Sequence, residues 1–180
     1  MADGISYWMS NFRSRGSDHG QPFFRSNGPS GGNFDFQYIS GANNTFKIPL
    51  TGSPPVDQPH DNFDESNSRF VVPFSGYYFF TWNVCVQCKN GDEIDDLGMS
   101  LRDNNNVIVN YEQGFHSWRG SGTAFGNYTG SCLYYCDTDD QIELYATAYN
   151  GYGSSTASGG YSIGSGTRTN LIGWLIGGSG

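Results

Sequence analysis

Carboxylates form the densest chemical cluster in this sequence. Four of them fall within five consecutive positions, in a run flanked by glycines: Asp92, Glu93, Asp95 and Asp96. Calcium takes about six to eight oxygen ligands, and a loop in which carboxylates and backbone carbonyls converge can supply them. A shorter acidic run, with Asp137, Asp139 and Asp140, is a second candidate. We therefore predict a calcium site at the first run, with solvated turn residues as the alternative interpretation of both.

The four cysteines occur as two closely spaced pairs, Cys85 with Cys88 and Cys132 with Cys136. Such spacing is found in the ligand pairs of small structural zinc sites. The same four residues are candidates for disulfide bridges, which an oxidising compartment favours. Spacing alone leaves zinc binding, disulfides and free thiols open.

Nucleophilic catalysis has little support in the sequence. The three histidines, His19, His60 and His116, lie far apart and have no carboxylate or cysteine at metal-ligand spacing. Residues 160–164 match the G-x-S-x-G pattern of a nucleophile elbow around Ser162, but that motif needs a strand before it and a helix after it. Here the pattern lies in a stretch rich in Gly and Ser, where chance matches are common. We predict that the protein is not an enzyme.

Two segments have the composition of ligand-binding loops. Residues 149–161 mix Tyr with Gly, Ser and Asn, and residues 111–118 offer a similar surface. Tyrosine gives contact area at a low entropy cost, while small polar groups provide adaptable hydrogen bonds. The predicted ligand-binding residues are Tyr149, Tyr152, Tyr161, His116 and Trp118. The alternative is that both segments are flexible connections.

The elements that must position these residues are predicted to be β-strands. The 180 residues include 12 Tyr, 13 Phe and 26 Gly, and no stretch repeats apolar residues at the i, i+3, i+4 spacing of a helix. Short apolar or alternating runs separated by Gly, Asn, Asp and Ser indicate an all-β sandwich or barrel. The expected strands are 34–39, 45–50, 69–72, 77–86, 97–102, 107–112, 123–135, 141–149 and 169–176.

Residues 1–32 are predicted to be an extended arm, and residues 33–180 a single head domain. Three Arg against two Asp give the arm a charge of +1, which leaves −9 for the rest of a chain whose total is −8. The arm could therefore lie on an acidic neighbour, with a solvated tail as the alternative. Because the arm contains several aromatic residues, we expect part of it to pack.

The overall charge limits the classes of partner. A net charge of −8 and a pI near 4.5 disfavour a nucleic-acid-binding role, which needs clustered Lys and Arg. No apolar run reaches the roughly 18 residues of a membrane-spanning helix, and the N-terminus lacks the charged-then-apolar layout of a signal peptide. We expect the protein to act outside the cell or on the surface of a particle, after removal of a signal peptide or by another export route.

Residues 70–80 carry the most specific motif, F-V-V-P-F-S-G-Y-Y-F-F. Tyr78, Phe80 and Trp82 recur at the period of two that places side chains on one face of a strand. We expect that face to be buried. The pattern F-x-x-P-x-x-G-x-Y-x-F resembles the signature of the globular head of complement C1q, a relative of tumour necrosis factor.

The resemblance extends over about residues 44–177. Phe63 supplies the apolar residue that the signature has upstream, whereas Gln58 stands where it has Asn or Asp. The closing run L-I-G-W-L-I is similar to the family's last strand, with Leu171 replacing its Phe. The resemblance implies a jelly-roll β-sandwich of two antiparallel sheets, a tight homotrimer, and calcium near the three-fold axis. No G-x-y repeat precedes the head, so we expect no collagen stalk in this chain.

The implied topology also bears on the cysteines. It places the strand of Cys85 beside and antiparallel to the strand that ends near Cys132, with Gly76 opposite about Leu133. Cys85 would then lie about nine residues, or roughly 30 Å, along the strand from Cys132. Neither a tetrahedral metal nor a direct disulfide spans that distance. Local bridges, an intersubunit bridge and free thiols remain, and we favour local bridges or free thiols.

Two functions fit these observations. The first is a trimeric, non-enzymatic recognition head, secreted or surface-displayed, whose loops bind a protein or carbohydrate partner. The second is a structural or receptor-attachment (spike) protein of a virus, a phage or an extracellular-matrix assembly, in which the arm anchors the head. Deleting residues 1–32 separates them, because a recognition head keeps its binding whereas an assembly component loses its incorporation.

Overall fold

A computed structural model of the chain describes residues 23–30, 34–36, 44–52, 62–88, 96–104, 106–114, 124–149 and 161–178. These residues form thirteen strands and two short 3-10 helices, η1 (Glu65–Asn67) and η2 (Gly166–Arg168). The all-β class that the sequence predicts is therefore confirmed. Within the described ranges, no helix is long and apolar enough to cross a membrane.

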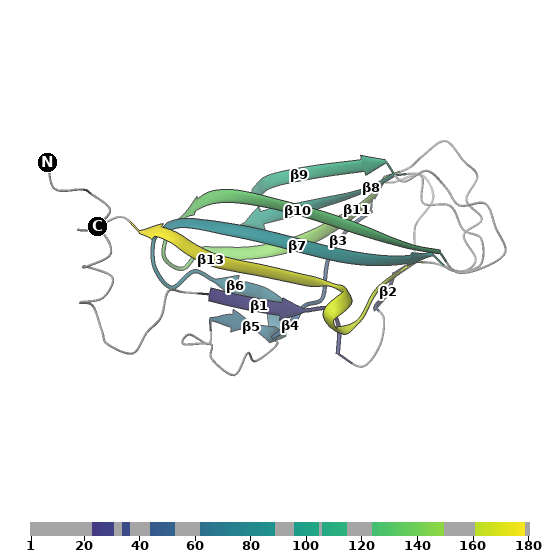
Figure 1. The fold of residues 1–180 in the computed structure, drawn as a ribbon, viewed down its shortest axis with the longest axis horizontal. Helices are drawn as coiled ribbons and strands as arrows, with labels where there is room; N and C mark the ends of the chain where they lie inside the picture. Colours follow the sequence, from purple (N-terminus) through teal and green to yellow (C-terminus); the bar gives the residue numbers. More distant parts are fainter. Residues whose placement is uncertain are drawn as a thin grey trace, which may run out of the picture.

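The strands pair antiparallel and form two sheets. Sheet A contains β1 (Phe23–Asn27), β2 (Phe34–Phe36), β4 (Thr51–Gly52), β7 (Gly76–Cys88), β10 (Ala124–Cys136), β12 (Tyr161–Ile163) and β13 (Asn170–Gly178). Sheet B contains β3 (Asn44–Lys47), β5 (Phe63–Asp64), β6 (Arg69–Val71), β8 (Asp96–Asp103), β9 (Asn106–Gly114) and β11 (Gln141–Tyr149). The long strands of both sheets run along the length of the molecule (Figure 1).

One long strand organises each sheet. In sheet A, β7 pairs with β10 along one edge, and with β13 and then β12 along the other. In sheet B, β11 pairs with β8 along one edge, and with β6 and β3 along the other. The two sheets pack as the layers of a jelly-roll sandwich, as the sequence predicts.

The two sheets enclose an aromatic core. Tyr78, Phe80 and Trp82 of β7 are at most 2% exposed, so the buried face that the sequence predicts is confirmed. Phe24 of β1 stacks on Phe70 of β6 with ring centroids 4.0 Å apart, which joins sheet A to sheet B. Large buried rings of this kind dominate the energetics of a core.

Four short strands, β1, β4, β5 and β12, lie outside the predicted strands. β1 falls within the predicted arm and pairs with β13, from Phe23 opposite Trp174 to Asn27 opposite Asn170. The expectation that part of the arm packs is confirmed for this strand, and sheet A begins before the predicted boundary at residue 32. Each of these strands is held by its neighbours, because a few residues carry too little local preference to form a strand alone.

The register of the β7–β10 pair differs from the predicted one. Gly76 lies opposite Cys136 rather than Leu133, so the predicted alignment is wrong by three residues. Cys85 consequently pairs with Asn127, five residues or roughly 17 Å along the strand from Cys132. Register between strands that are distant in the sequence depends on the packing of both sheets, which the pattern of one strand does not determine.

Candidate functional site

Six strand ends meet at one end of the sandwich, which we call the loop end (Figure 1). In sheet A, Cys88 at the end of β7 pairs with both Ala124 of β10 and Tyr161 of β12. In sheet B, the first residue of β8 pairs with the last residues of β9 and β11; these three are Asp96, Gly114 and Tyr149. The register of each sheet therefore aligns these ends.

The loop end anchors the segments that the sequence singles out. Residues 89–95, 115–123 and 150–160 each leave one sheet and enter the other at this end. Three predicted site residues are strand residues there: Asp96, Tyr149 and Tyr161. The other predicted residues of these three segments lie outside the described residues, and they are Asp92, Glu93, Asp95, His116, Trp118 and Tyr152. The fold thus gathers the anchors of the predicted calcium and ligand-binding segments, whose individual residues stay predictions.

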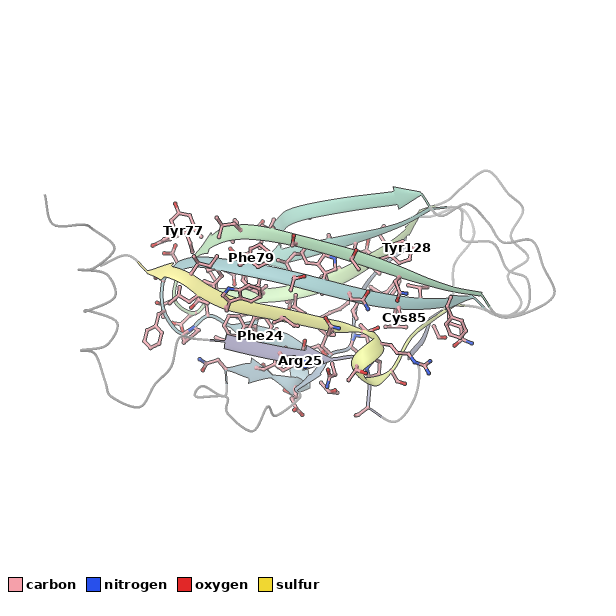
Figure 2. All side chains as sticks on the ribbon, in the orientation of Figure 1. Phe24, Arg25, Tyr77, Phe79, Cys85 and Tyr128 are labelled. Atoms are coloured by element: carbon pink, nitrogen blue, oxygen red, sulfur yellow. The ribbon has the colours of Figure 1, made fainter. Side chains whose placement is uncertain are left out.

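The outer face of sheet A carries a second feature, an apolar surface. Leu133 of β10 is 58% exposed and Ile176 of β13 is 48% exposed. Phe79 of β7 lies opposite Leu133, and its ring packs beside that of Trp174, with centroids 4.8 Å apart. Phe79 lies toward the end where β7 begins (Figure 2). We call Phe79, Leu133, Trp174 and Ile176 the apolar face.

The three strands that carry this face have no charge. None of β7, β10 and β13 contains Asp, Glu, Lys, Arg or His over its whole length. Toward the loop end the same face becomes polar apart from Phe125, through Asn83, Gln87, Asn127, Thr129 and Ser131. Charge depletion around exposed aromatic and aliphatic groups is the composition of a protein–protein interface core.

The outer face of sheet B has the opposite character. Lys47 of β3 forms a salt bridge with Glu143 of β11, and the Tyr145 hydroxyl donates a 2.9 Å hydrogen bond to the same carboxylate. The Arg102 guanidinium lies 4.2 Å from the centroid of the Tyr145 ring. Such cross-strand polar contacts are typical of a sheet face that meets water. Of the two outer faces, sheet A is therefore the one suited to association.

Cys85, Cys132 and Cys136 are free thiols in the structure. The side chain of Cys88 lies outside the described residues. Burial raises the pKa of Cys132 to about 11 and also raises the pKa values of Cys85 and Cys136. These thiols are protonated at neutral pH and are therefore poor nucleophiles and poor metal ligands.

The remaining chemical motifs fall on buried or hydrogen-bonded positions. Among the described residues, no three His, Cys, Asp or Glu side chains are placed to hold a metal. The acidic turn with Asp137, Asp139 and Asp140 lies within this described part of the chain. Ser162 is fully buried in β12, where its hydroxyl donates to Gln87 Oε1 at 3.4 Å. The strand leads into the 3-10 helix η2 rather than an α-helix, so the G-x-S-x-G pattern does not form a nucleophile elbow.

Carboxylates do gather at the opposite end of the sandwich. Asp140 accepts hydrogen bonds of 2.7 Å from the side chain of Asn104 and from the backbone N–H of Asp137. The Tyr134 hydroxyl donates to Asp103 Oδ2 at 3.2 Å. Burial first, and then the charge of Asp140, raises the pKa of Asp103 above its ordinary value. The ionised form of Asp103 is therefore disfavoured in the folded protein.

Asp103→Asn is expected to raise the free energy of unfolding by about 0.5–1 kcal/mol at pH 7. Because the pKa of Asp103 is raised in the folded state, its protonated form is favoured there, and ionisation of Asp103 destabilises the fold as pH rises through that pKa. Asn resembles the protonated form and keeps an acceptor for Tyr134, so the gain should vanish below about pH 4. Urea unfolding at both pH values, at one protein concentration, measures the difference. The exposed control Glu65→Gln should show no such change, and an equal gain for Asp103→Asn at both pH values would contradict the explanation.

No protein-family model matches the sequence, and no curated protein matches it. Among solved structures, the fold is similar to that of Eiger TNF from S. frugiperda, with a TM-score of 0.60, 12% identity, and coverage of 89% of this chain and 96% of that chain. It is also similar to the globular domain of zebrafish complement 1qA protein, with a TM-score of 0.52, 13% identity, and coverage of 87% and 98%. The chain therefore has the C1q/TNF-like jelly-roll fold that the motif at residues 70–80 predicts.

Proposed function

We propose that the chain is a non-enzymatic recognition head that forms a homotrimer through the apolar face and binds a protein or carbohydrate partner at the loop end. The observation that carries the proposal is an exposed apolar surface on three uncharged strands, in a chain with a net charge of −8. The resemblance to the C1q globular head implies the number of subunits. We place this activity outside the cell or on a particle surface.

The energetics favour association through this surface. Burying a Leu or Ile side chain contributes about 1.5–3 kcal/mol, and each subunit would bury both Leu133 and Ile176. Because the three strands have no charged residues, the carboxylates that give the chain its negative charge stay outside the contact. Apolar burial can therefore outweigh the repulsion between like-charged subunits.

A trimer would also bring three copies of the loop end together. Cyclic symmetry places equivalent ends of the subunits together, so the three inter-sheet segments of every subunit would occupy one surface. Several weak contacts made at once on such a surface bind more tightly than any single contact. A recognition function needs no further domain for multivalency.

Light scattering on the intact chain tests the trimer and the calcium prediction together. The expected mass is three times the 19.7 kDa of one chain. If calcium binds the acidic run at residues 92–96, a chelator should weaken ligand binding or the trimer, and added calcium should restore it. A monomer both with and without chelator would contradict the proposal.

Tyr152→Ala is expected to weaken binding of the trimer to its partner by about tenfold or more, since tyrosines in binding loops are common hot spots. A glycan array identifies a carbohydrate partner first, and titration of the best ligand then gives the change in affinity. Val107→Thr is the matched control, because Val107 is exposed on β9 next to the β8–β9 turn, at the end opposite the loop end. Unchanged binding by Tyr152→Ala would show that the binding site lies outside residues 150–160.

A further inference from the structure

The end of the sandwich opposite the loop end, which we call the terminal end, carries another exposed surface. β7 begins there and β10 ends there, with Tyr77 paired to Tyr135 (Figure 2). The two rings meet edge-on with centroids 5.2 Å apart, and both are exposed, as is Phe74 just before β7. The turn after β10 adds two exposed carboxylates, Asp137 and Asp139. We call these five residues the terminal rim.

The rim is held in place by hydrogen bonds between the two segments that form it. The backbone N–H of Ser75 donates to Thr138 Oγ1 at 3.1 Å, and the N–H of Thr138 donates to Ser75 Oγ at 2.9 Å. The N–H of Asp139 donates to the Val72 carbonyl at 2.8 Å. A surface fixed in this way loses little entropy when a ligand binds to it.

The charge of the rim is not neutralised by its surroundings. Within the described ranges both salt bridges lie on sheet B, and neither involves Asp137 or Asp139. The negative potential at this end also acts on Asp103, whose pKa is raised by burial and then by Asp140. Exposed rings beside unpaired carboxylates suit a ligand that carries both aromatic side chains and arginines.

The chain's own N-terminal segment has this chemistry. Residues 5–15, I-S-Y-W-M-S-N-F-R-S-R, contain two arginines, no carboxylate and five large apolar or aromatic side chains: Ile5, Tyr7, Trp8, Met9 and Phe12. Tryptophan, tyrosine and arginine are the residues that most often dominate binding energy at interfaces.

The topology brings this segment to the rim. Phe23, the first residue of β1, pairs with Trp174, which in turn pairs with Phe79, so the chain before β1 leaves at the terminal end. Phe23 lies two strand spacings from β7, or about 10 Å. The eight residues from 15 to 23 can span up to about 27 Å, so the segment can reach the rim of its own subunit.

We propose that residues 5–15 dock on the terminal rim, with their aromatic side chains on its rings and Arg13 and Arg15 on its carboxylates. The docked segment would cover aromatic surface that is otherwise exposed and would neutralise part of the charge at this end. The docking does not rest on the proposed trimer, because it requires only one subunit.

Hydrogen–deuterium exchange of the full chain tests the docking. Amides of residues 5–15 should exchange at least about tenfold more slowly than in the variant Trp8→Ser/Phe12→Ser. The rim variant Asp137→Asn/Asp139→Asn should lose most of this protection, and so should wild-type protein at high salt. Asn is tolerated at residue 139, where φ is 73°, so the rim variant should keep its turn. Glu65→Gln, an exposed carboxylate in η1, is the matched control and should keep the protection.

Three results would overturn the proposal. The first is exchange of residues 5–15 at the unstructured rate in the wild-type chain. The second is protection that survives in the rim variant while its melting temperature is unchanged, which would place the segment elsewhere. The third is protection of residues 5–15 that is lost on dilution of the wild-type chain, which would place the segment on a second copy rather than on the rim of its own subunit.

Discussion

Leu133→Glu is expected to leave the protein as a folded monomer. Leu133 is 58% exposed in the single subunit, so the change should alter the stability of the fold by no more than about 0.5 kcal/mol. In the proposed trimer each subunit would lose about 1.5–3 kcal/mol of apolar burial and would also bury a charge. Three subunits lose this energy together, which weakens association by more than about a thousandfold. Light scattering should show a fall to the mass of one chain, with an unchanged circular dichroism spectrum.

A matched variant on the other sheet shows whether dissociation depends on where the glutamate is placed or only on the added charge. Val107 of β9 is 53% exposed and lies on sheet B, so Val107→Glu introduces the same charge at an apolar residue of similar exposure. This control should remain trimeric. If Leu133→Glu keeps the wild-type mass, or if both variants dissociate alike, the apolar face is not the contact between subunits.

Gly173→Ala is expected to reduce the free energy of unfolding by about 2 kcal/mol or more. Gly173 lies opposite Phe24 on one side and Phe80 on the other, in the middle of sheet A. A methyl group there would meet Phe24 Cε1 at 2.2 Å and Phe80 Cδ1 at 2.8 Å, so buried rings must move. The sign of the change in unfolding free energy is informative, because an unhindered Gly→Ala change within a strand should instead increase that free energy by about 0.5–1 kcal/mol. Urea unfolding at a fixed protein concentration measures the loss.

Two further variants test the mechanism. Gly130→Ala should be destabilising for the same reason, since its methyl group would lie 2.2 Å from Trp82 Cζ2. In Gly173→Ala/Phe24→Leu, the smaller side chain at residue 24 should accommodate the methyl group, so the total loss should be less than the sum of the two single losses. A strictly additive double variant, or a stabilising Gly173→Ala, would show that the rings do not crowd this position.

The buried face of β7 could be predicted from the sequence because its signal is local. Alternate residues of one strand share a face, so Tyr78, Phe80 and Trp82 could be assigned to one buried face before any partner strand was known. β1 gave no such signal. Its five residues belong to sheet A because β13 lies beside them, and that contact joins opposite ends of the chain.

The apolar face had a sequence signal that was missed. Tyr77 and Phe79 alternate with the core residues of β7, so this strand is aromatic on both faces, which indicates a strand covered on both sides. The absence of charge from the whole of β7, β10 and β13 points the same way. The strand boundaries had to be known before the two-sided aromatic alternation of β7 and the absence of charge could be told apart from the high aromatic content of the whole chain.

The sequence by itself determined the all-β class, the buried face of β7 and, through the motif at residues 70–80, the jelly-roll family of folds. Only the tertiary structure decided the β7–β10 register, the shared anchoring of residues 89–95, 115–123 and 150–160, and the exposure of Leu133. The physical reason is the range of the interactions. Side-chain alternation acts between neighbours in the chain, whereas register, convergence of strand ends and exposure arise from pairings between strands that are far apart in the sequence.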